Sequence, residues 1–154
     1  MSKISGMFKI IENWKIKRIN HKTKELIDKE EICNTVVNDG LERVAKMINN
    51  IDGTYFRALA VGTGTTAPTN SDSSLETEYT RALASLSYEA DYKAKFEKTF
   101  EFGSGVSEDI TEAGIFDSDT VSGSTMLART TFSAKSVNSD IDLIVTAEIS
   151  VSRV

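Results

Sequence analysis

The chain is poor in the residue types that build metal centres and nucleophilic active sites. Its 154 residues include one cysteine, Cys33, and one histidine, His21. One cysteine excludes an intrachain disulfide, and one cysteine with one histidine cannot supply a Cys/His zinc centre. A catalytic triad would need His21 as its imidazole, but His21 lies in a polar stretch typical of an exposed turn. We therefore expect no enzymatic activity, no cofactor and no metal site, and we interpret Cys33 as a small buried apolar residue.

Long hydrophobic runs are also missing. The longest uninterrupted apolar stretches are only a few residues, and the N-terminal segment is too polar for a signal peptide or a spanning helix. We therefore expect no membrane partner, and a chain made and kept in a cytoplasm-like, reducing setting. One proline, 40% hydrophobic residues and 27% charged residues are typical of a globular protein, and the length suits a single domain.

The net charge of −5 is unevenly distributed along the chain. Residues 1–50 carry ten Lys/Arg against seven Asp/Glu, whereas residues 51–154 carry eight against sixteen. An acidic body disfavours a nucleic-acid partner, because phosphate binding needs a concentrated basic face. A basic cluster near the N-terminus is either the solvated face of a hairpin, which we favour, or a local contact surface. The cluster consists of Lys15, Lys17, Arg18, Lys22 and Lys24.

Alternation of apolar and polar residues predicts two long strands, each with one buried face, at residues 92–102 and 141–151. Shorter β patterns predict strands at 55–61 and 125–132, and a hairpin at 14–28. The long loops at 62–72 and 103–111 are candidates for contacts with other molecules.

Residues 38–50 break the β pattern. Apolar residues recur there at i, i+3, i+4 and i+7, which predicts an amphipathic helix of about three turns. These residues are Leu41, Val44, Ala45 and Ile48, and Asp39 with Glu42 resembles a capping box. A second helical turn is predicted at 73–81. The fold class is therefore mainly β: an antiparallel β-sandwich with one amphipathic helix packed on it.

A glycine-threonine loop, Gly62-Thr-Gly-Thr-Thr, follows the strand predicted at 55–61. It lacks the Gly-Lys-Ser/Thr ending of a phosphate-binding loop, so we do not expect a nucleotide there. We expect Gly62 and Gly64 to adopt positive φ in a turn. Four neighbouring carboxylate pairs do not follow a calcium-loop pattern and are typical of turns. These pairs are Glu76 and Glu78, Glu108 and Asp109, Asp117 and Asp119, and Asp140 and Asp142.

An ion-pair constellation is predicted around Arg81. Glu78 and Arg81 are three residues apart, so a helix would place them on one face. Glu112 precedes a small-residue turn and two apolar anchors in the run 111–116. We expect a buried Arg81 to bridge Glu112 and tie this loop to the sheet, which is a structural role and not a catalytic one.

Five blocks of sequence, in this order, carry a family resemblance over about residues 30–151. They are Asn38-Asp-Gly-Leu-x₃-Ala45, Phe56-Arg-Ala-Leu-Ala-Val-Gly-Thr-Gly-Thr-Thr-Ala-Pro68, Ser71-Asp72-x₂-Leu75-x₂-Glu78-x₂-Arg81, Glu112-Ala-Gly-Ile-Phe116 and Met126-Leu-Ala-Arg-Thr-Thr-Phe132. Together they resemble small bacteriophage virion structural proteins of the tail-fibre, head-fibre or capsid-decoration type.

The resemblance implies a β-rich virion subunit without catalytic residues, made in the bacterial host cytoplasm and assembled on the capsid surface, neck or tail. We expect other virion proteins and further copies of the chain as its partners. Residues 1–30, with Trp14 and the basic cluster, fall outside the matching blocks and are interpreted as an N-terminal hairpin or attachment arm, followed by a β-sandwich domain at 31–154.

Two other functions are weighed against this one. The first is a receptor- or glycan-binding module in which Tyr79, Tyr88 and Tyr92, or the loop 62–72, contact host-surface sugars. The second is polysaccharide hydrolysis or lyase action, which is the weakest because the chain offers no convincing catalytic set.

Overall fold

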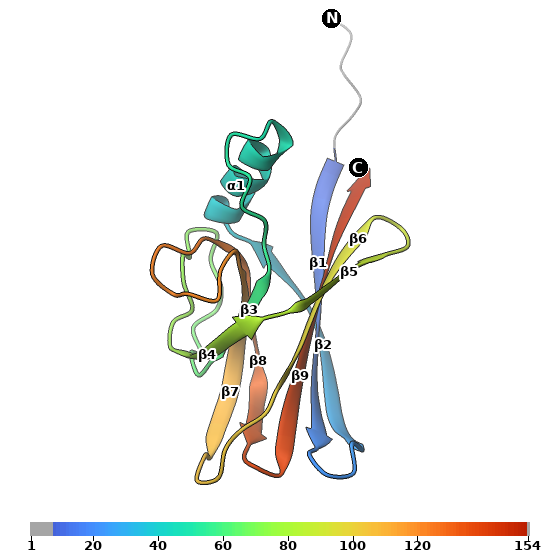
Figure 1. Ribbon diagram of the computed structural model, residues 1–154, viewed down its shortest axis with the longest axis vertical. Coiled ribbons are helices and arrows are strands. Elements are labelled where there is room, and N and C mark those ends of the chain that lie inside the picture. Colours follow the sequence, from blue (N-terminus) through green and yellow to red (C-terminus); the bar gives the residue numbers. More distant parts are fainter. Residues whose placement is uncertain (1–7, 154) are drawn as a thin grey trace, which may run out of the picture.

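The structure describes residues 8–153, except for the side chains of residues 34 and 35. This part of the chain contains nine strands and one helix. The structure is a computed structural model (Figure 1). The elements are β1 (Phe8–Asn20), β2 (Leu26–Val36), α1 (Asn38–Ile48), β3 (Ala58–Gly62), β4 (Glu78–Leu83), β5 (Ser85–Glu89), β6 (Lys93–Phe100), β7 (Glu108–Phe116), β8 (Met126–Val137) and β9 (Ile141–Arg153).

The strands form two antiparallel sheets that face each other. Sheet A has the order β2-β1-β9-β6-β5, and sheet B has the order β4-β3-β7-β8. Buried side chains of both sheets meet in one core, among them Trp14 and Val145 of sheet A and Leu59 and Ile115 of sheet B. The architecture confirms the predicted β-sandwich with one helix.

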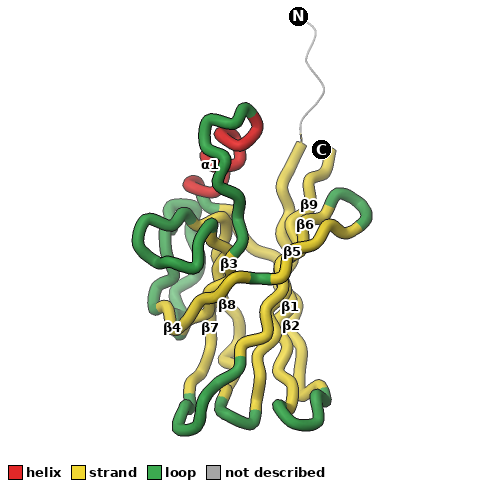
Figure 2. The backbone as a smooth tube through the Cα atoms, in the orientation of Figure 1, coloured by secondary structure: helices red, strands yellow, loops and turns green. Residues whose placement is uncertain are grey.

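The two sheets are joined along both edges. On one side β2 pairs with β1 over most of its length, and its Val36 then pairs with Ala128 of β8. On the other side β4 runs into β5 with only Ala84 between them, and the Ala84 N–H donates to the carbonyl of Arg57. The core is therefore closed laterally. Figure 2 shows turns gathered at the end of the sandwich opposite α1.

The N-terminal hairpin is part of sheet A. β1 pairs with β9 from Phe8 to Asn20, so it is an interior strand of that sheet. The boundary expected at residue 30 falls inside β2. Trp14 is fully buried, because its position shares the core-facing parity of Ile16. The hairpin is thus confirmed, but its first strand holds the sandwich together and is not separate from the domain 31–154.

Helix α1 lies at one end of the sandwich, while the turns β1–β2, β6–β7 and β8–β9 lie at the other end (Figure 1). The predicted capping box does not form, because Val37 is the N-cap residue and makes no side-chain cap hydrogen bond. The helix approaches β8 closely at Gly40, where a Cβ would lie 2.5 Å from the carbonyl oxygen of Leu127. No helix in residues 8–153 is both long and apolar enough to cross a membrane.

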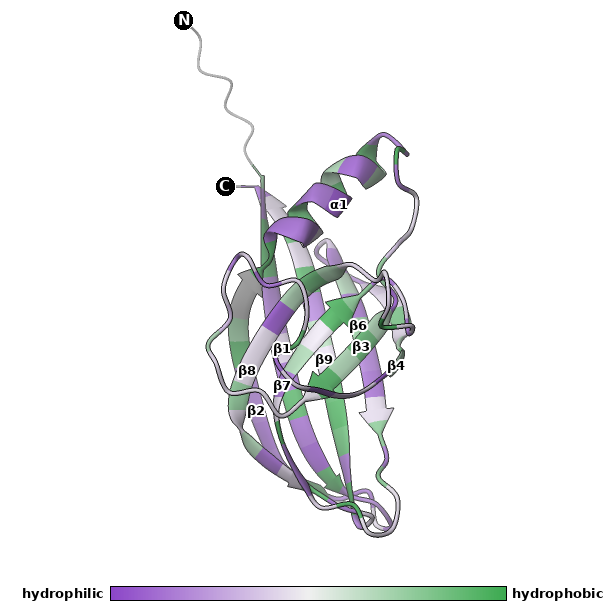
Figure 3. Cartoon of the chain, turned by 90° about the vertical axis from the view of Figure 1, so that its left-hand side faces the viewer, coloured by the Kyte–Doolittle hydropathy of each residue, from purple (hydrophilic) through white to green (hydrophobic). Residues whose placement is uncertain are grey.

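The predicted core face of α1 is largely exposed. Leu41 and Ile48 are 47% and 75% exposed, and Ala45 is exposed as well. Only Val44 and Met47 pack against the core from the side that faces the strands. Figure 3 shows this helix standing over the end of the sandwich with hydrophobic and hydrophilic positions interleaved. An apolar stripe predicted to be packed on the sheet is therefore mostly without a partner in residues 8–153.

The prediction of a second helical turn at 73–81 is wrong. Residues 73–77 are irregular and β4 begins at Glu78. The cause is a buried carboxylate: Glu112 accepts hydrogen bonds from the backbone N–H groups of Glu76 and Thr77. Cys33 is also not buried as expected, because it lies on the outward-facing parity of β2 and is exposed.

Candidate functional site

A buried ion pair between Glu112 of β7 and Arg129 of β8 organises the long loop between β3 and β4. Arg129 Nε donates to Glu112 Oε2 at 2.9 Å, and the Glu112 side chain is inaccessible to solvent. Arg129 also donates to Asp72 at 2.9 Å and to the carbonyl of Thr66 at 3.0 Å. Because the carboxylate also binds backbone N–H groups of the loop, the pair is fully compensated inside the protein.

The surroundings favour the charged states of Arg129 and of its second partner, Asp72. Burial disfavours the Arg129 guanidinium, but hydrogen bonds to Glu112 and Asp72 outweigh this and raise the pKa of Arg129. Burial would raise the pKa of Asp72, yet hydrogen bonds from Thr69 and Arg129 lower it. The loop is therefore held by charge-assisted bonds at neutral pH.

Gly62 and Gly64 make this network possible because neither has a side chain. Neither glycine has positive φ, so that expectation is wrong. A Cβ at Gly62 would clash with the carbonyl of Thr77, and a Cβ at Gly64 would lie 2.6 Å from Glu112 Oε1. The Gly64 N–H also donates to that oxygen at 3.0 Å. The glycines therefore let the loop backbone approach the buried carboxylate.

Arg81 does not bridge Glu112, in contrast to the sequence-based expectation. Its guanidinium makes two 2.7 Å hydrogen bonds to the Glu78 carboxylate and reaches Ser118 and Ser124 of the β7–β8 loop. It also stacks 3.8 Å from the ring centroid of Phe116. A register shift opposite Gly62 lets Glu78 and Arg81 pair within a strand, so the predicted pair exists without the helix.

Arg129 is the residue that sequence reasoning missed. It lies in the quoted run 126–132, flanked by the buried residues Ala128 and Thr130. An arginine in such a run, together with Glu112 in the equally buried β7, is a signal for a buried pair between neighbouring strands. From the sequence alone, either Arg81 or Arg129 could be the partner of Glu112. The pairing register of β7 with β8 places Arg129 beside Glu112.

The basic cluster is divided among ion pairs. Lys15 pairs with Glu148 at 3.5 Å, Arg18 with Asp28 at 2.7 Å and Lys24 with Asp142 at 3.2 Å. Most of these pairs are exposed in part, and such pairs contribute little to stability. Neighbouring strands therefore neutralise part of the cluster's charge, and the choice between a solvated hairpin face and a local contact surface stays a prediction.

His21, Glu101 and Asp142 form a small group at the turn end of the sandwich, with potential ligand atoms within 4.8 Å of one another. Asp142 is 1% exposed and binds His21 Nδ1 at 2.8 Å and Lys24 Nζ at 3.2 Å. His21 is therefore a half-buried partner of Asp142 and not a freely exposed turn residue. Because Lys24 already supplies a positive charge to the carboxylate, the arrangement suits an ion-pair cluster, and the expected lack of a metal stays a prediction.

An apolar groove of about 430 Å³ opens between α1 and the end of sheet A. Its helix side is formed by Val44, Met47 and Ile48, and its floor by Phe56 and Leu127. Sheet A contributes residues on neighbouring strands, namely Ala94, Phe96 and Ile149, and Tyr55 completes the rim. This groove lies where the helix stripe is exposed.

Glu12 lies beside the groove in the same row of sheet A. It is opposite Ile149, which is itself opposite Ala94, and both of those residues line the groove. Glu12 is 1% exposed, and its Oε2 accepts a 3.2 Å hydrogen bond from Trp14 Nε1. Among the side chains that the structure describes, its Oε1 is the one buried nitrogen or oxygen atom without a hydrogen-bond partner. Burial raises the pKa of the Glu12 carboxyl to about 7, against the opposing effect of Trp14.

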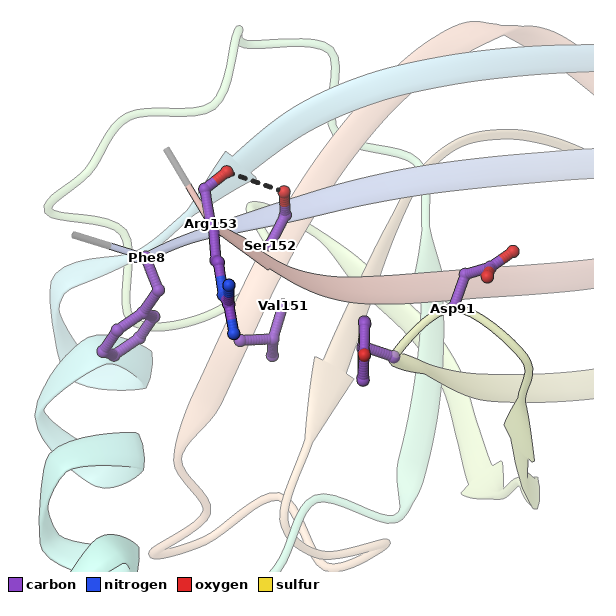
Figure 4. A pocket seen from close by; sticks show the side chains of 6 residues that line it. Phe8, Asp91, Val151, Ser152 and Arg153 are labelled. Carbon is purple, nitrogen blue, oxygen red and sulfur yellow. Dashed lines mark hydrogen bonds between the residues drawn. The ribbon is translucent and has the colours of Figure 1, made fainter. Parts of the chain in front are cut away.

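A second, polar-rimmed hollow of about 720 Å³ lies beside the β5–β6 hairpin tip. Phe8, Val151 and Arg153 project to the same side of β1 and β9 there, and Asp91 and Tyr92 border the hollow from the hairpin (Figure 4). Tyr92 is 73% exposed. Of the tyrosines proposed for sugar contacts, the structure brings Tyr88 and Tyr92 to one hairpin, whereas Tyr79 lies on β4 beside Phe102.

Compared with protein-family models, curated proteins and solved structures, the chain shows no match. The resemblance to bacteriophage structural proteins therefore stays a prediction, and the site has to be interpreted from its own geometry.

Proposed function

We propose that this chain is a non-enzymatic structural subunit of a bacteriophage particle, repeated on the capsid surface, neck or tail as a decoration or fibre-like protein. Its partners are other virion proteins and further copies of itself. The observation that carries the proposal is the apolar groove beside the exposed face of α1, because an exposed apolar surface of this kind suits protein–protein contact.

The residues that carry the family resemblance support a structural role. Gly62, Gly64, Glu112 and Arg129 meet in one buried network that holds a surface loop in a single conformation. Arg81 does the same for the loop between β7 and β8. A subunit that is repeated on a particle needs such fixed loops, because many weak contacts add up only when each copy presents the same surface.

The proposal is tested by purifying particles on a density gradient from a host that carries the gene and quantifying the chain by mass spectrometry. We expect many copies for each particle, at a fixed ratio to the major capsid or tail protein. Particles from a gene deletion are the control, and for a decoration protein they lose resistance to heat or osmotic shock. A chain found only in fractions without particles would contradict the proposal.

A second candidate function is binding to a host-surface glycan. The hairpin tip favours it, because Tyr92 lies beside Asp91 and Arg153 around an open hollow, and aromatic faces with nearby polar groups suit sugars. We expect Tyr92→Ala to weaken binding of the purified chain to host polysaccharide at least 10-fold, while Tyr79→Ala leaves it unchanged. No binding of the wild-type chain at millimolar sugar would remove this candidate.

A further inference from the structure

Large exposed apolar side chains gather around the groove at the helix end of the molecule, in an area that we call the apolar end surface. It consists of the groove and a set of large side chains around it that are between 45% and 75% exposed. These side chains are Phe8, Ile48, Ile51, Tyr55, Leu86, Tyr88, Tyr92 and Val151.

Strand register shows that the sheet part of this surface is continuous. Leu86 is paired with Phe96 and Tyr88 with Ala94, so both side chains share the face that lines the groove. Ile149 follows in the same row, and Val151 lies on the same face two residues further along β9. This face belongs to the interior of the sandwich, but here sheet B does not cover it.

The size of the surface matches a protein interface. A whole aromatic side chain offers about 150–250 Å² and an aliphatic one somewhat less, so the exposed parts of the eight side chains sum to about 800 Å². A stable interface buries about 800 Å² on each partner. The largest apolar patch on a typical monomer is about 300–600 Å².

Backbone conformation at the hairpin tip is a second, independent observation. Asp91 and Tyr92 have φ values of 65° and 63°, in the left-handed region. This conformation suits the tight turn, but it is unfavourable for an aromatic residue, where glycine would be preferred. The chain thus holds a tyrosine in a strained position in which its ring forms part of the apolar end surface.

The surface contains both a projection and a hollow. Ile51, just after the end of α1, is 73% exposed, and the groove beside the helix is concave. A surface that carries a knob and a hole can pair with itself across a two-fold axis, because each copy then supplies what the other accepts. We infer that the apolar end surface is a self-association interface, in which Ile51 of one copy enters the groove of a second copy of this chain.

Charges on the helix side of the rim are compatible with this pairing. Around the helix, Lys46 is paired with Glu42, and Arg43 with Asp52 and Asp117, so the helix brings little uncompensated charge to the contact. The inference deepens the proposed function by naming its self-contact surface. It is tested on the isolated chain, so its failure would leave open whether the chain binds a particle.

The experiment measures the mass of the full-length chain by sedimentation equilibrium from about 1 to 200 µM. We expect the wild-type mass to rise from 16.9 kDa towards twice that value. Ile51→Glu places a charge on the knob, and Ala94→Arg fills the groove with a charged side chain. Each should raise the dissociation constant at least about 100-fold, because an unpaired charge is costly in an apolar contact. Leu26→Glu is the control, since Leu26 is 58% exposed in the hairpin at the opposite end.

Mixing the two variants tests the two-fold geometry. In a mixed pair one knob-and-groove contact is intact, and at the other contact the introduced acid faces the introduced base. We therefore expect the mixture to associate at least about 10-fold more tightly than either variant alone. A wild-type chain that stays monomeric at 200 µM overturns the inference, as does equal weakening by Leu26→Glu. No gain on mixing overturns the knob-in-groove arrangement. Circular dichroism verifies that all variants are folded.

Discussion

Arg129 Nε donates a 2.9 Å hydrogen bond to Glu112 Oε2, and the two side chains are 3% and 0% exposed. The contact joins neighbouring strands of sheet B and, through further bonds to loop residues, fixes the segment between β3 and β4. The fold therefore depends on a buried charged pair at the place where the sequence has its most distinctive motifs.

Removing one member of this pair should be far more damaging than removing a surface pair. Arg129→Met leaves the Glu112 carboxylate buried without its cation, so we expect the free energy of unfolding to fall by about 3–5 kcal/mol. Urea denaturation measures this. Lys15→Met, which breaks the partly exposed pair with Glu148, is the matched control and should cost about 0–1 kcal/mol. Similar losses for both variants would argue against a special role of the buried pair.

The two-glycine loop offers a test of close backbone approach. Gly64→Ala places a Cβ 2.5 Å from the Glu76 Cβ and 2.6 Å from Glu112 Oε1, so the loop has to shift and we expect a loss of about 2 kcal/mol or more. Gly103→Ala is the control, because nothing lies within 4 Å of its Cβ position. Thermal unfolding of both variants decides the point, and a neutral Gly64→Ala would contradict the account.

Glu12 should make stability fall as the pH rises. Its pKa is about 7 in the folded protein against 4.5 for an ordinary glutamate. Below pH 4.5 both states are protonated; between pH 4.5 and 7 only the unfolded state loses the proton, so folding becomes less favourable. Above pH 7 the cost levels off at about 3 kcal/mol.

Glu12→Gln removes this titration. We expect the variant to be more stable than the wild type at pH 8, with the difference shrinking towards pH 4.5. Chemical denaturation over that pH range measures it, with Glu25→Gln at an exposed turn position as the control for the change in net charge. A constant difference between Glu12→Gln and wild type at all pH values would show that Glu12 does not titrate as proposed.

Tyr92 should lower the stability of the isolated chain and strengthen its self-association. Tyr92→Gly relieves the positive φ, and we expect the isolated chain to gain about 0.5–1 kcal/mol. The same variant removes a ring from the apolar end surface and should weaken self-association. Thermal unfolding at low concentration and sedimentation at high concentration separate the two effects. A variant that associates as tightly as wild type would exclude Tyr92 from the interface.

Much of the architecture is predictable because local periodicity reports burial. The strands predicted at 92–102 and 141–151 correspond to β6 and β9, and the helix predicted at 38–50 corresponds to α1. β7 is missed over most of its length, because a strand buried on both faces and containing Glu112 and Gly114 shows no alternation. The irregular segment before β4 is missed because the Glu112 carboxylate takes the N–H groups that a helix would use.

The candidate site is less predictable than the fold. Periodicity shows that α1 has an apolar stripe, but it does not show what covers that stripe, and Leu41 and Ile48 prove to be exposed. The choice between Arg81 and Arg129 as the partner of Glu112 depends on strand register, which single-sequence patterns do not determine. The groove itself joins residues from α1, β6 and β9 that are about 50 positions apart in sequence.

Electron cryo-microscopy of particles from a host that carries the gene would test the proposed function and the self-association interface together. We expect repeated, symmetry-related density into which the β-sandwich fits, with the apolar end surface of each copy covered by another copy. Particles that contain no such density, or that display the chain with this surface open to solvent, would contradict this expectation.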